Sequence, residues 1–311
     1  MDFNEWNIIW SLSFGVMAAI AVAGNTVTLV IFLKRQLRKR PHFLLISLAV
    51  ADLLVGLLSI PLYMTLHNDL YEGSVLPATA KWVDMFTGFT SMFTLAAISL
   101  ERMYAIGWPF RHRVLNSQVY IFAIAIPWIL ALIGASMILV LQYVIRQRHT
   151  LIIIVSVCLS TPIAVSCTAY FVLWKKERYR MIPRQAQEVR DLKLAKTVGL
   201  ITGAFLVTWL PFEFLVIVLN VCTSCRDVSP AIVFIIKLLH FGNSVVNIVI
   251  YPVKNEEYRA ALVEMVSAYR CFCRRHQVGL SVNVGASVIS LASIVDHTPR
   301  RESDCQQTSR L

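Results

Sequence analysis

Charged side chains are scarce in this sequence and are absent from three long stretches. Asp, Glu, Lys and Arg make up 15% of the chain, whereas a soluble domain carries about 25%. None of the four occurs in Ile8–Leu33, Val119–Ile145 or Leu151–Trp174. Each stretch exceeds the roughly 20 residues that a helix needs to cross a bilayer. Apolar runs of this length argue against a soluble helical bundle.

Four further apolar stretches carry only a few charges each, at residues 43–66, 83–106, 197–222 and 230–253. The sequence therefore predicts an all-α fold, a bundle of seven transmembrane helices. Residues 254–277 have apolar side chains on one helical face and charged ones on the other, and suit an amphipathic eighth helix on the membrane surface. We expect residues 278–311, rich in Ser, Val and Asn, to form a disordered cytoplasmic tail.

Positive charge is nearly missing from every second loop. The loops at residues 34–40, 111–113 and 175–196 hold fifteen lysines and arginines, against four in the alternate loops. The positive-inside rule then places the N-terminus outside and the C-terminus in the cytosol. We expect a short extracellular N-terminus at residues 1–7 and a transmembrane domain at 8–253, in the plasma membrane. This arrangement accounts for the net charge of +11 without a nucleic-acid partner.

Motifs of catalysis are also lacking. We find no His-Glu-x-x-His and no Gly-x-Ser-x-Gly, so we expect neither an enzyme nor a cofactor beyond a bound ion. A transporter or proton pump is a distant alternative, with Asp52, Glu213 and Lys237 as an intramembrane relay. The sequence shows no internal repeat and no pair of broken helices to support it. Flux of a solute across vesicles would support this alternative, whereas guanine-nucleotide-sensitive signalling would argue against it.

Two pairs of cysteines lie outside the apolar stretches. Cys222 and Cys225 follow the sixth stretch in an outer loop, where a disulfide can persist. We predict a local bridge between them, with two unpaired thiols as the alternative. Cys271 and Cys273 lie among basic residues after the last stretch, and we expect them to be palmitoylated.

The stretch from Asp84 to Arg102 links the two membrane surfaces. In a helix six of its residues, which include both charged ends, recur at steps of four and three residues and share one face. Its two ends are about 27 Å apart along the axis, close to the thickness of a hydrocarbon core. The positions on this face are Asp84, Gly88, Ser91, Leu95, Ile98 and Arg102. We interpret this helix as the element that transmits a change at one membrane surface to the other surface.

Seven short motifs, one in each stretch and in order, make the chain resemble a class A, rhodopsin-like G-protein-coupled receptor. They are Gly24-Asn25, Leu48–Asp52, Glu101-Arg102-Met103, Trp128, Pro162 with Tyr170, Trp209-Leu210-Pro211, and Asn247–Tyr251. Two features depart from the family pattern. Ile248 replaces the proline of the last motif, and Pro77 stands where the family keeps a cysteine bridged to the second outer loop. Loss of this bridge, with a short second outer loop, resembles the melanocortin, lysolipid and cannabinoid receptors.

The resemblance implies two sites inside the bundle. The first is an activation switch in which two acids hold the Arg102 guanidinium until the sixth helix moves outward. Its residues are Glu101, Arg102, Tyr170, Asp191, Pro211 and Tyr251. The second is an allosteric sodium site, for which a hydrogen-bond network without an ion is the alternative. Its residues are Asp52, Ser91, Asn243, Ser244 and Asn247.

The resemblance also implies an outer ligand site, and Asp84 falls where aminergic receptors keep the acid that binds an amine. The expected lining is Asp84, Gly88, Trp209, Phe212, Glu213, Lys237, His240 and Phe241. If Lys237 pairs with Glu213, Asp84 is left for a cationic ligand; if it pairs with Asp84, the amine interpretation weakens and Glu213 is the odd charge. A lipid or peptide ligand is the alternative. An opsin is not favoured, because Phe241 stands at the position of the retinal lysine.

The expected partners are therefore an extracellular small-molecule ligand, a heterotrimeric G protein and the lipid bilayer. Serines and threonines in the tail suggest arrestin binding. The last four residues, Thr308–Leu311, resemble a ligand for a PDZ domain.

Overall fold

The computed structural model describes residues 3–34, 42–65, 75–145, 148–178, 186–222 and 228–268. Inside these ranges the side chains of residues 3–7, 148–149, 176–178, 186–188, 190–191, 194 and 220 are not described. The described part is helical and holds no strand. Its elements are α1 Phe3–Leu33, α2 His42–Leu54, a π-helical turn η1 Val55–Ser59, α3 Ile60–Thr65, α4 Leu76–Gly107, α5 Pro109–Arg113, α6 Ser117–Val140, a second π-helical turn η3 Leu141–Ile145, α7 Arg148–Arg178, α8 Ala186–Val221 and α9 Pro230–Lys254.

Seven helices of the described part are long and apolar enough to cross a membrane, as the sequence predicts. They are α1, α2 with η1 and α3, α4, α6 with η3, α7, α8 and α9. The third span begins earlier than its apolar stretch, at Leu76. This longer helix includes Lys81, whose ammonium is hydrogen-bonded to Gln142 near the end of the fourth span.

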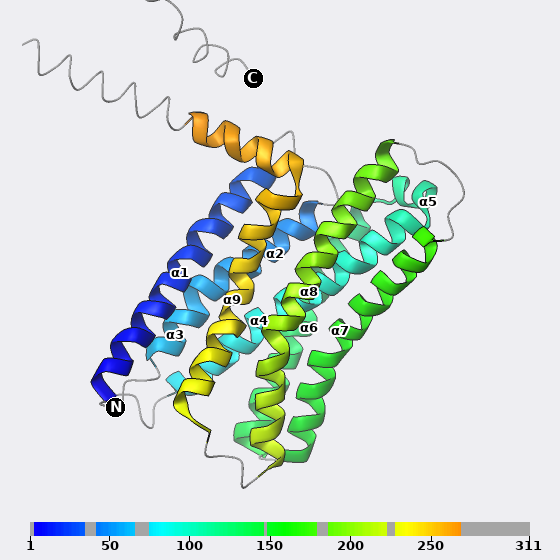
Figure 1. The fold of residues 1–311 in the computed structure, drawn as a ribbon. Coiled ribbons are helices and arrows are strands. Elements are labelled where there is room, and N and C mark those ends of the chain that lie inside the picture. The colour runs from blue at the N-terminus through cyan, green and yellow to red at the C-terminus, as the bar shows by residue number, and fades with distance from the viewer. Residues whose placement is uncertain are drawn as a thin grey trace, which may run out of the picture. The chain divides into compact units, whose positions relative to one another are not determined.

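Helix α4 lies at the centre of the bundle. It packs against α2, α6, α7 and α8, while α9 closes the bundle by contacting both α1 and α8. In Figure 1, α1, α2 and α9 lie together on one side and α7 and α8 lie side by side on the other, with α4 between them. A side chain on α4 can therefore reach most of the other spans, which suits the reporting role that its sequence suggests.

The bundle is polar within and apolar outside. Asn25, Asp52, Ser91 and Arg102 are all at most 1% exposed. Many large apolar side chains instead face outward, among them Ile8, Leu12, Ile121, Phe171 and Val207. An exposed apolar surface of this extent fits a lipid environment. The polar interior is where function must be sought, because charges in a bilayer are retained at a cost of several kcal/mol.

The second span deviates from regular helical geometry near its proline. Pro61 has no N–H to donate, and the π-helical turn η1 ends at Ser59, two residues before it. At the end of this turn the N–H of Ile60 bonds the carbonyl of Val55, five residues back. The same turn brings Gly56 close to Ala21 and Val22 of α1. The irregularity near Pro61 thus takes the form of one wider helical turn.

Residues 256–268 form a further helix, in a compact unit that begins at Glu256. Tyr258 and Ala261 are its buried side chains. Its other boundary and the predicted palmitoylation sites Cys271 and Cys273 lie outside the described residues, as does the predicted tail at 278–311. At the other terminus α1 begins at Phe3 and its membrane-crossing part at Ile8.

Candidate functional site

Helix α4 presents one buried face along its length, as the residue spacing predicts. Gly88, Ser91, Leu95, Ile98 and Arg102 are all buried. Asp84, at the predicted outer end, keeps only 16% of its side chain exposed. Both charged ends of the face therefore point into the bundle and away from lipid.

The Asp84 carboxylate is bound by two side chains from α9. Lys237 Nζ donates to Asp84 Oδ2 at 2.7 Å, and His240 Nε2 lies 3.3 Å from Asp84 Oδ1. The Lys237 side chain is 12% exposed and that of His240 5%. Lys237 thus pairs with Asp84, which decides between the two pairings that the sequence leaves open. This is the pairing that weakens an amine site at Asp84 alone and leaves Glu213 as the odd charge. We call Asp84, Lys237 and His240 the outer cluster.

Three aromatic rings surround the ammonium of Lys237. Its Nζ lies 4.3 Å from the centre of the Phe212 ring and 5.1 Å from those of Tyr63 and Phe241. Ring faces attract a cation at these distances, and more strongly where water is excluded. The sequence predicts Phe212 and Phe241 at this site but misses Tyr63. A regular helical period could not find it, because the π-helical turn at Val55–Ser59 lies between Asp52 and Tyr63.

Trp209 of α8 fills the space beneath the outer cluster. Its ring centre lies 4.4 Å from that of His240. A Cβ at Gly88 would lie 2.8 Å from Trp209 Cη2, so Gly88 contributes by leaving room for the indole. Among the described residues neither Trp209 Nε1 nor His240 Nδ1 has a hydrogen-bond partner, although both atoms are buried.

Glu213 is the second acid of the outer site. It lies on α8, partly buried, and accepts a hydrogen bond from Ser160 of α7 at 3.5 Å. Within the described part of the chain Glu213 forms no ion pair, because Lys237 is bound to Asp84. The four predicted polar residues of the outer site therefore fall into two groups. Asp84, Lys237 and His240 of α4 and α9 bind one another, and Glu213 lies apart from them on α8.

A second cluster surrounds Asp52, whose side chain is fully buried. Ser91 and Ser244 each donate to Oδ1 at 3.2 Å, and Asn247 Nδ2 donates to Oδ2 at 2.7 Å. Asn243, the fifth predicted member, is buried on α9. Asn25 does not pair with Asp52; its amide donates to the backbone carbonyls of Ala21 and Ser244.

This Asp52 cluster has the ligand chemistry of a monovalent hard cation. Asp52 supplies one negative charge, and the hydroxyls of Ser91 and Ser244 supply neutral oxygens directed at it. Asn247 Oδ1 is buried without a hydrogen-bond partner among the described residues. Carboxylate, hydroxyl and amide oxygens are the donors that hard cations prefer, so these residues fit a sodium ion.

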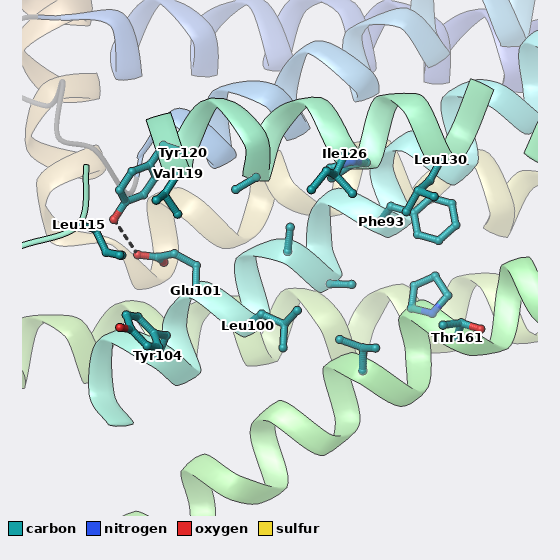
Figure 2. A pocket seen from close by; sticks show the side chains of 16 residues that line it. Phe93, Leu100, Glu101, Tyr104, Leu115, Val119, Tyr120, Ile126, Leu130 and Thr161 are labelled. Atoms are coloured by element: carbon teal, nitrogen blue, oxygen red, sulfur yellow. Dashed lines mark hydrogen bonds between the residues drawn. The ribbon is translucent and has the colours of Figure 1, made fainter. Parts of the chain in front are cut away.

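At the predicted inner end Arg102 is 1% exposed and forms an ion pair with its neighbour Glu101. Glu101 Oε1 also lies 2.7 Å from His112 Nε2 and accepts a 3.4 Å hydrogen bond from the hydroxyl of Tyr120. The Tyr120 hydroxyl and His112 Nε2 are 3.0 Å apart. Sequence reasoning misses His112, because the turn at Trp108 that brings α5 back to Glu101 has no helical period. It also misses Tyr120, which reaches Glu101 from α6 (Figure 2).

The inner ends of α7 and α8 pack beside this ion pair. Leu192 and Ala195 of α8 form a buried cluster with Ile106 and Leu173, against which Tyr170 packs. The side chain of Asp191, the predicted second acid of the switch, lies outside the described residues. Tyr251 is buried and packs edge-on against Phe32 at 5.5 Å, and Pro211 lies inside the continuous helix α8.

Ile248, which replaces the expected proline, packs against α1. A Cβ at Gly24 would lie 2.7 Å from both Cγ1 and Cγ2 of Ile248 and closer still to Cδ1. Helix α9 runs without interruption through this point to Lys254. The residue that departs from the family pattern therefore fills the space left by the glycine of the first motif.

One cysteine of the predicted disulfide, Cys222, is disulfide-bonded in the structure. Cys225 lies outside the described residues, so its pairing with Cys222 stays a prediction. Cys158 and Cys167 of α7 are free thiols.

The sequence matches the profile of the 7 transmembrane receptor (rhodopsin family) over residues 24–251. The chain belongs to this family, the class A G-protein-coupled receptors, and is a multi-pass membrane receptor, not an enzyme. It is similar to the histamine H2 receptor of Cavia porcellus, with 24% identity over 91% of this chain and 86% of that receptor. Dopamine receptor 1 of Drosophila melanogaster is 27% identical over 88% of this chain and 65% of its own length. Octopamine receptor beta-2R of Chilo suppressalis is 24% identical over 88% of this chain and 85% of its own length.

Proposed function

We propose that this receptor acts at the plasma membrane and binds a small organic amine at Asp84 and Glu213. The observation that carries the proposal is the charge of the outer site. Asp84 and Lys237 cancel, and Glu213 leaves one negative charge without an ion-pair partner among the described residues. A cationic ligand balances that charge. The relatives named for histamine, dopamine and octopamine support the same ligand class.

Lys237 acts in this proposal as the resting counter-ion of Asp84. A buried acid that loses its partner is destabilised by about 3–5 kcal/mol. A ligand ammonium that replaces the Lys237 ammonium leaves Asp84 paired throughout, so the exchange avoids that penalty. The displaced lysine stays within the rings of Phe212, Tyr63 and Phe241, which attract its charge.

Signalling follows from a shift between two helix packings, biased by the ligand's higher affinity for one of them. In the resting packing Arg102 is held by Glu101, and we propose Asp191 as the second acid. In the active packing the inner end of α8 separates from α4 and exposes the surface that activates a G protein. Sodium at Asp52, Ser91, Ser244 and Asn247 would supply a positive charge that favours the resting packing.

The test is an amine panel on cells that report G-protein activation, with histamine, dopamine and octopamine as the first probes. We expect an amine to activate the wild type and Asp84→Asn to raise its half-maximal concentration by about 10–150-fold. This range follows from about 1.5–3 kcal/mol for a hydrogen bond to a charged group. Lys237→Met should lower that concentration, because the competing ammonium is gone.

Lys81→Met is the matched control for Lys237→Met. Lys81 also lies near the outer end of a span, but its ammonium bonds Gln142. Lys81 still interacts electrostatically with Asp84 and Lys237, but it does not occupy the Asp84 carboxylate, so the control should lower the half-maximal concentration less than Lys237→Met does. A lipid or peptide that activates wild type and Asp84→Asn equally would contradict the amine proposal. Activation lost in Lys237→Met but kept in Asp84→Asn would indicate an anionic ligand instead. We also propose that arrestin binds serines and threonines of the tail and that a PDZ protein binds Thr308–Leu311. Both sites lie outside the described residues.

A further inference from the structure

Lys81 of α4 borders the outer site. It stands three residues before Asp84 and seven before Gly88, so it continues the buried face of α4 outward by about one turn. Its side chain is half-buried, and its charge interacts with the charges of Asp84 and Lys237. Lys81 therefore belongs to the electrostatic surroundings of the outer cluster and does not simply face lipid.

The ammonium of Lys81 is held by a neutral group. It donates to Oε1 of Gln142, which lies in the π-helical turn η3 at the end of the fourth span. Among the described residues Lys81 forms no ion pair, because Asp84 is already bound to Lys237. Charges taken out of water are normally paired, so this ammonium is open to an anion. The amide nitrogen of Gln142 carries two further donors beside it.

The outer site thus holds two charges that no ion pair balances within the described part of the chain, one of each sign. Glu213 of α8 is the acid and Lys81 of α4 is the base, while Asp84 and Lys237 balance each other. A simple amine balances Glu213 and leaves Lys81 as it is. A ligand with both an ammonium and an acid balances both charges and brings no net charge into the site.

Depth in the bundle sets the order of the two ligand groups. A Cβ at Gly88 would lie 2.8 Å from Trp209 Cη2, so these two residues lie at similar depth. Glu213 lies one turn outward of Trp209 on α8, as Asp84 lies one turn outward of Gly88 on α4. Lys81 lies about 4.5 Å further out along α4. The ammonium of the ligand therefore lies deeper and its acid nearer the outer surface, a few bonds away.

We infer that the ligand of the outer site is an amino acid whose carboxylate is bound by Lys81, an inference that rests on the proposed amine function. The ligand ammonium pairs with the acids of the amine site. Its carboxylate accepts hydrogen bonds from Lys81 Nζ and from the amide nitrogen of Gln142. Lys81 and Gln142 then determine specificity, because they distinguish an amino acid from the amine that its decarboxylation would yield.

The experiment compares compounds that differ by one carboxylate. L-histidine is paired with histamine, L-DOPA with dopamine and L-tyrosine with tyramine, on cells that express the full receptor and report G-protein activation in amino-acid-free buffer. We expect one of the amino acids to act at a half-maximal concentration at least about tenfold below that of its amine, since a charged hydrogen bond is added. The readout is the ratio of the two concentrations, because a change in surface expression moves both in the same direction.

Two variants should remove the preference by different routes. Lys81→Met deletes the cation, and should raise the half-maximal concentration of the amino acid about tenfold while lowering that of the amine. Gln142→Glu keeps Lys81 but gives it an acid from within the receptor, and should change the ratio in the same direction. Lys81→Arg keeps the charge and should retain the preference. Thr79→Ala, two residues away and exposed, is the control and should leave the ratio unchanged.

The outcomes separate this inference from the amine proposal. Amines more potent than their amino acids on the wild type, or a ratio unchanged in both Lys81→Met and Gln142→Glu, would overturn the inference and leave the amine proposal standing. A ratio that changes in Lys237→Met but not in Lys81→Met would assign the carboxylate to Lys237 and also overturn it. A receptor present at the cell surface that neither series activates would contradict the amine proposal itself, and the inference with it.

Discussion

The contact between Gly24 of α1 and Ile248 of α9 makes the sharpest prediction for stability. A methyl group at position 24 would overlap the Ile248 side chain, with Cγ1 and Cγ2 both at 2.7 Å. These two carbons branch from the same Cβ, so one rotation cannot relieve both overlaps. Overpacking of this kind costs about 1–3 kcal/mol. Alanine offsets part of this, because glycine within a helix is disfavoured by up to about 1 kcal/mol.

A matched substitution on the same helix separates the two effects. Gly15 has no atom within 4 Å of the position that a Cβ would occupy. Gly15→Ala should therefore gain the stability that comes from the higher helix propensity of alanine, with no overpacking cost. We expect Gly24→Ala to unfold below Gly15→Ala by the overpacking cost, a difference of roughly 2–5 °C in Tm for a chain of this length. Thermal denaturation of the detergent-solubilised receptor measures it.

Two second substitutions test whether Ile248 is the cause. In the Gly24→Ala background Ile248→Ala removes both γ carbons and should restore part of the lost stability, an interaction of about 1 kcal/mol or more. Ile248→Val removes Cδ1, the closest atom, but keeps the two γ carbons, so it should restore less than alanine does. If Gly24→Ala matches Gly15→Ala, or if Ile248→Ala restores none of the lost stability, the close packing of the two helices at this point is refuted.

Three further predictions concern single interactions inside the bundle. Asp52→Ala should abolish the effect of sodium on agonist affinity; sodium sensitivity that persists in binding assays would exclude the ion site. Asp191→Asn should raise basal G-protein activation, since it removes one acid from Arg102, and unchanged basal activity would count against the proposed switch. Trp128→Phe should lower stability by about 1 kcal/mol through loss of the 2.9 Å hydrogen bond to Ser47 Oγ. Adding Ser47→Ala should cost little more, and a fully additive loss in thermal denaturation would show that the bond contributes nothing.

The spans and the Asp52 cluster could be predicted because each rests on a local signal. Absence of charge over some 20 residues can be read from any one stretch, so the ends of most spans agree to within a few residues. Asp52 and Asn247 stand in motifs that place them at matching depth, and their hydrogen bonds follow once the helices pack. Such features depend little on how each helix is rotated or bent.

Features that depend on rotation and bending could not be predicted. Lys237 had two acids on neighbouring helices to choose from, and the choice rests on tilts that the residue pattern does not encode. The π-helical turn at Val55–Ser59 rotates the outer half of the second span, which brings Tyr63 to Lys237. His112 reaches Glu101 only because the chain turns at Trp108, and a helical period cannot foresee a turn.

Helix α4 differs mechanically from the helices around it. No proline lies inside it, since its Pro77 is at the first turn, whereas α6, α7, α8 and α9 each contain an internal proline. An unbroken series of backbone hydrogen bonds resists bending. A rotation imposed at Asp84 is therefore transmitted to Arg102, because the helix turns as one rigid body. The proline-bearing neighbours can absorb motion as hinges. Inserting a proline midway along α4 would therefore uncouple the two ends of the receptor even if both sites kept their local geometry.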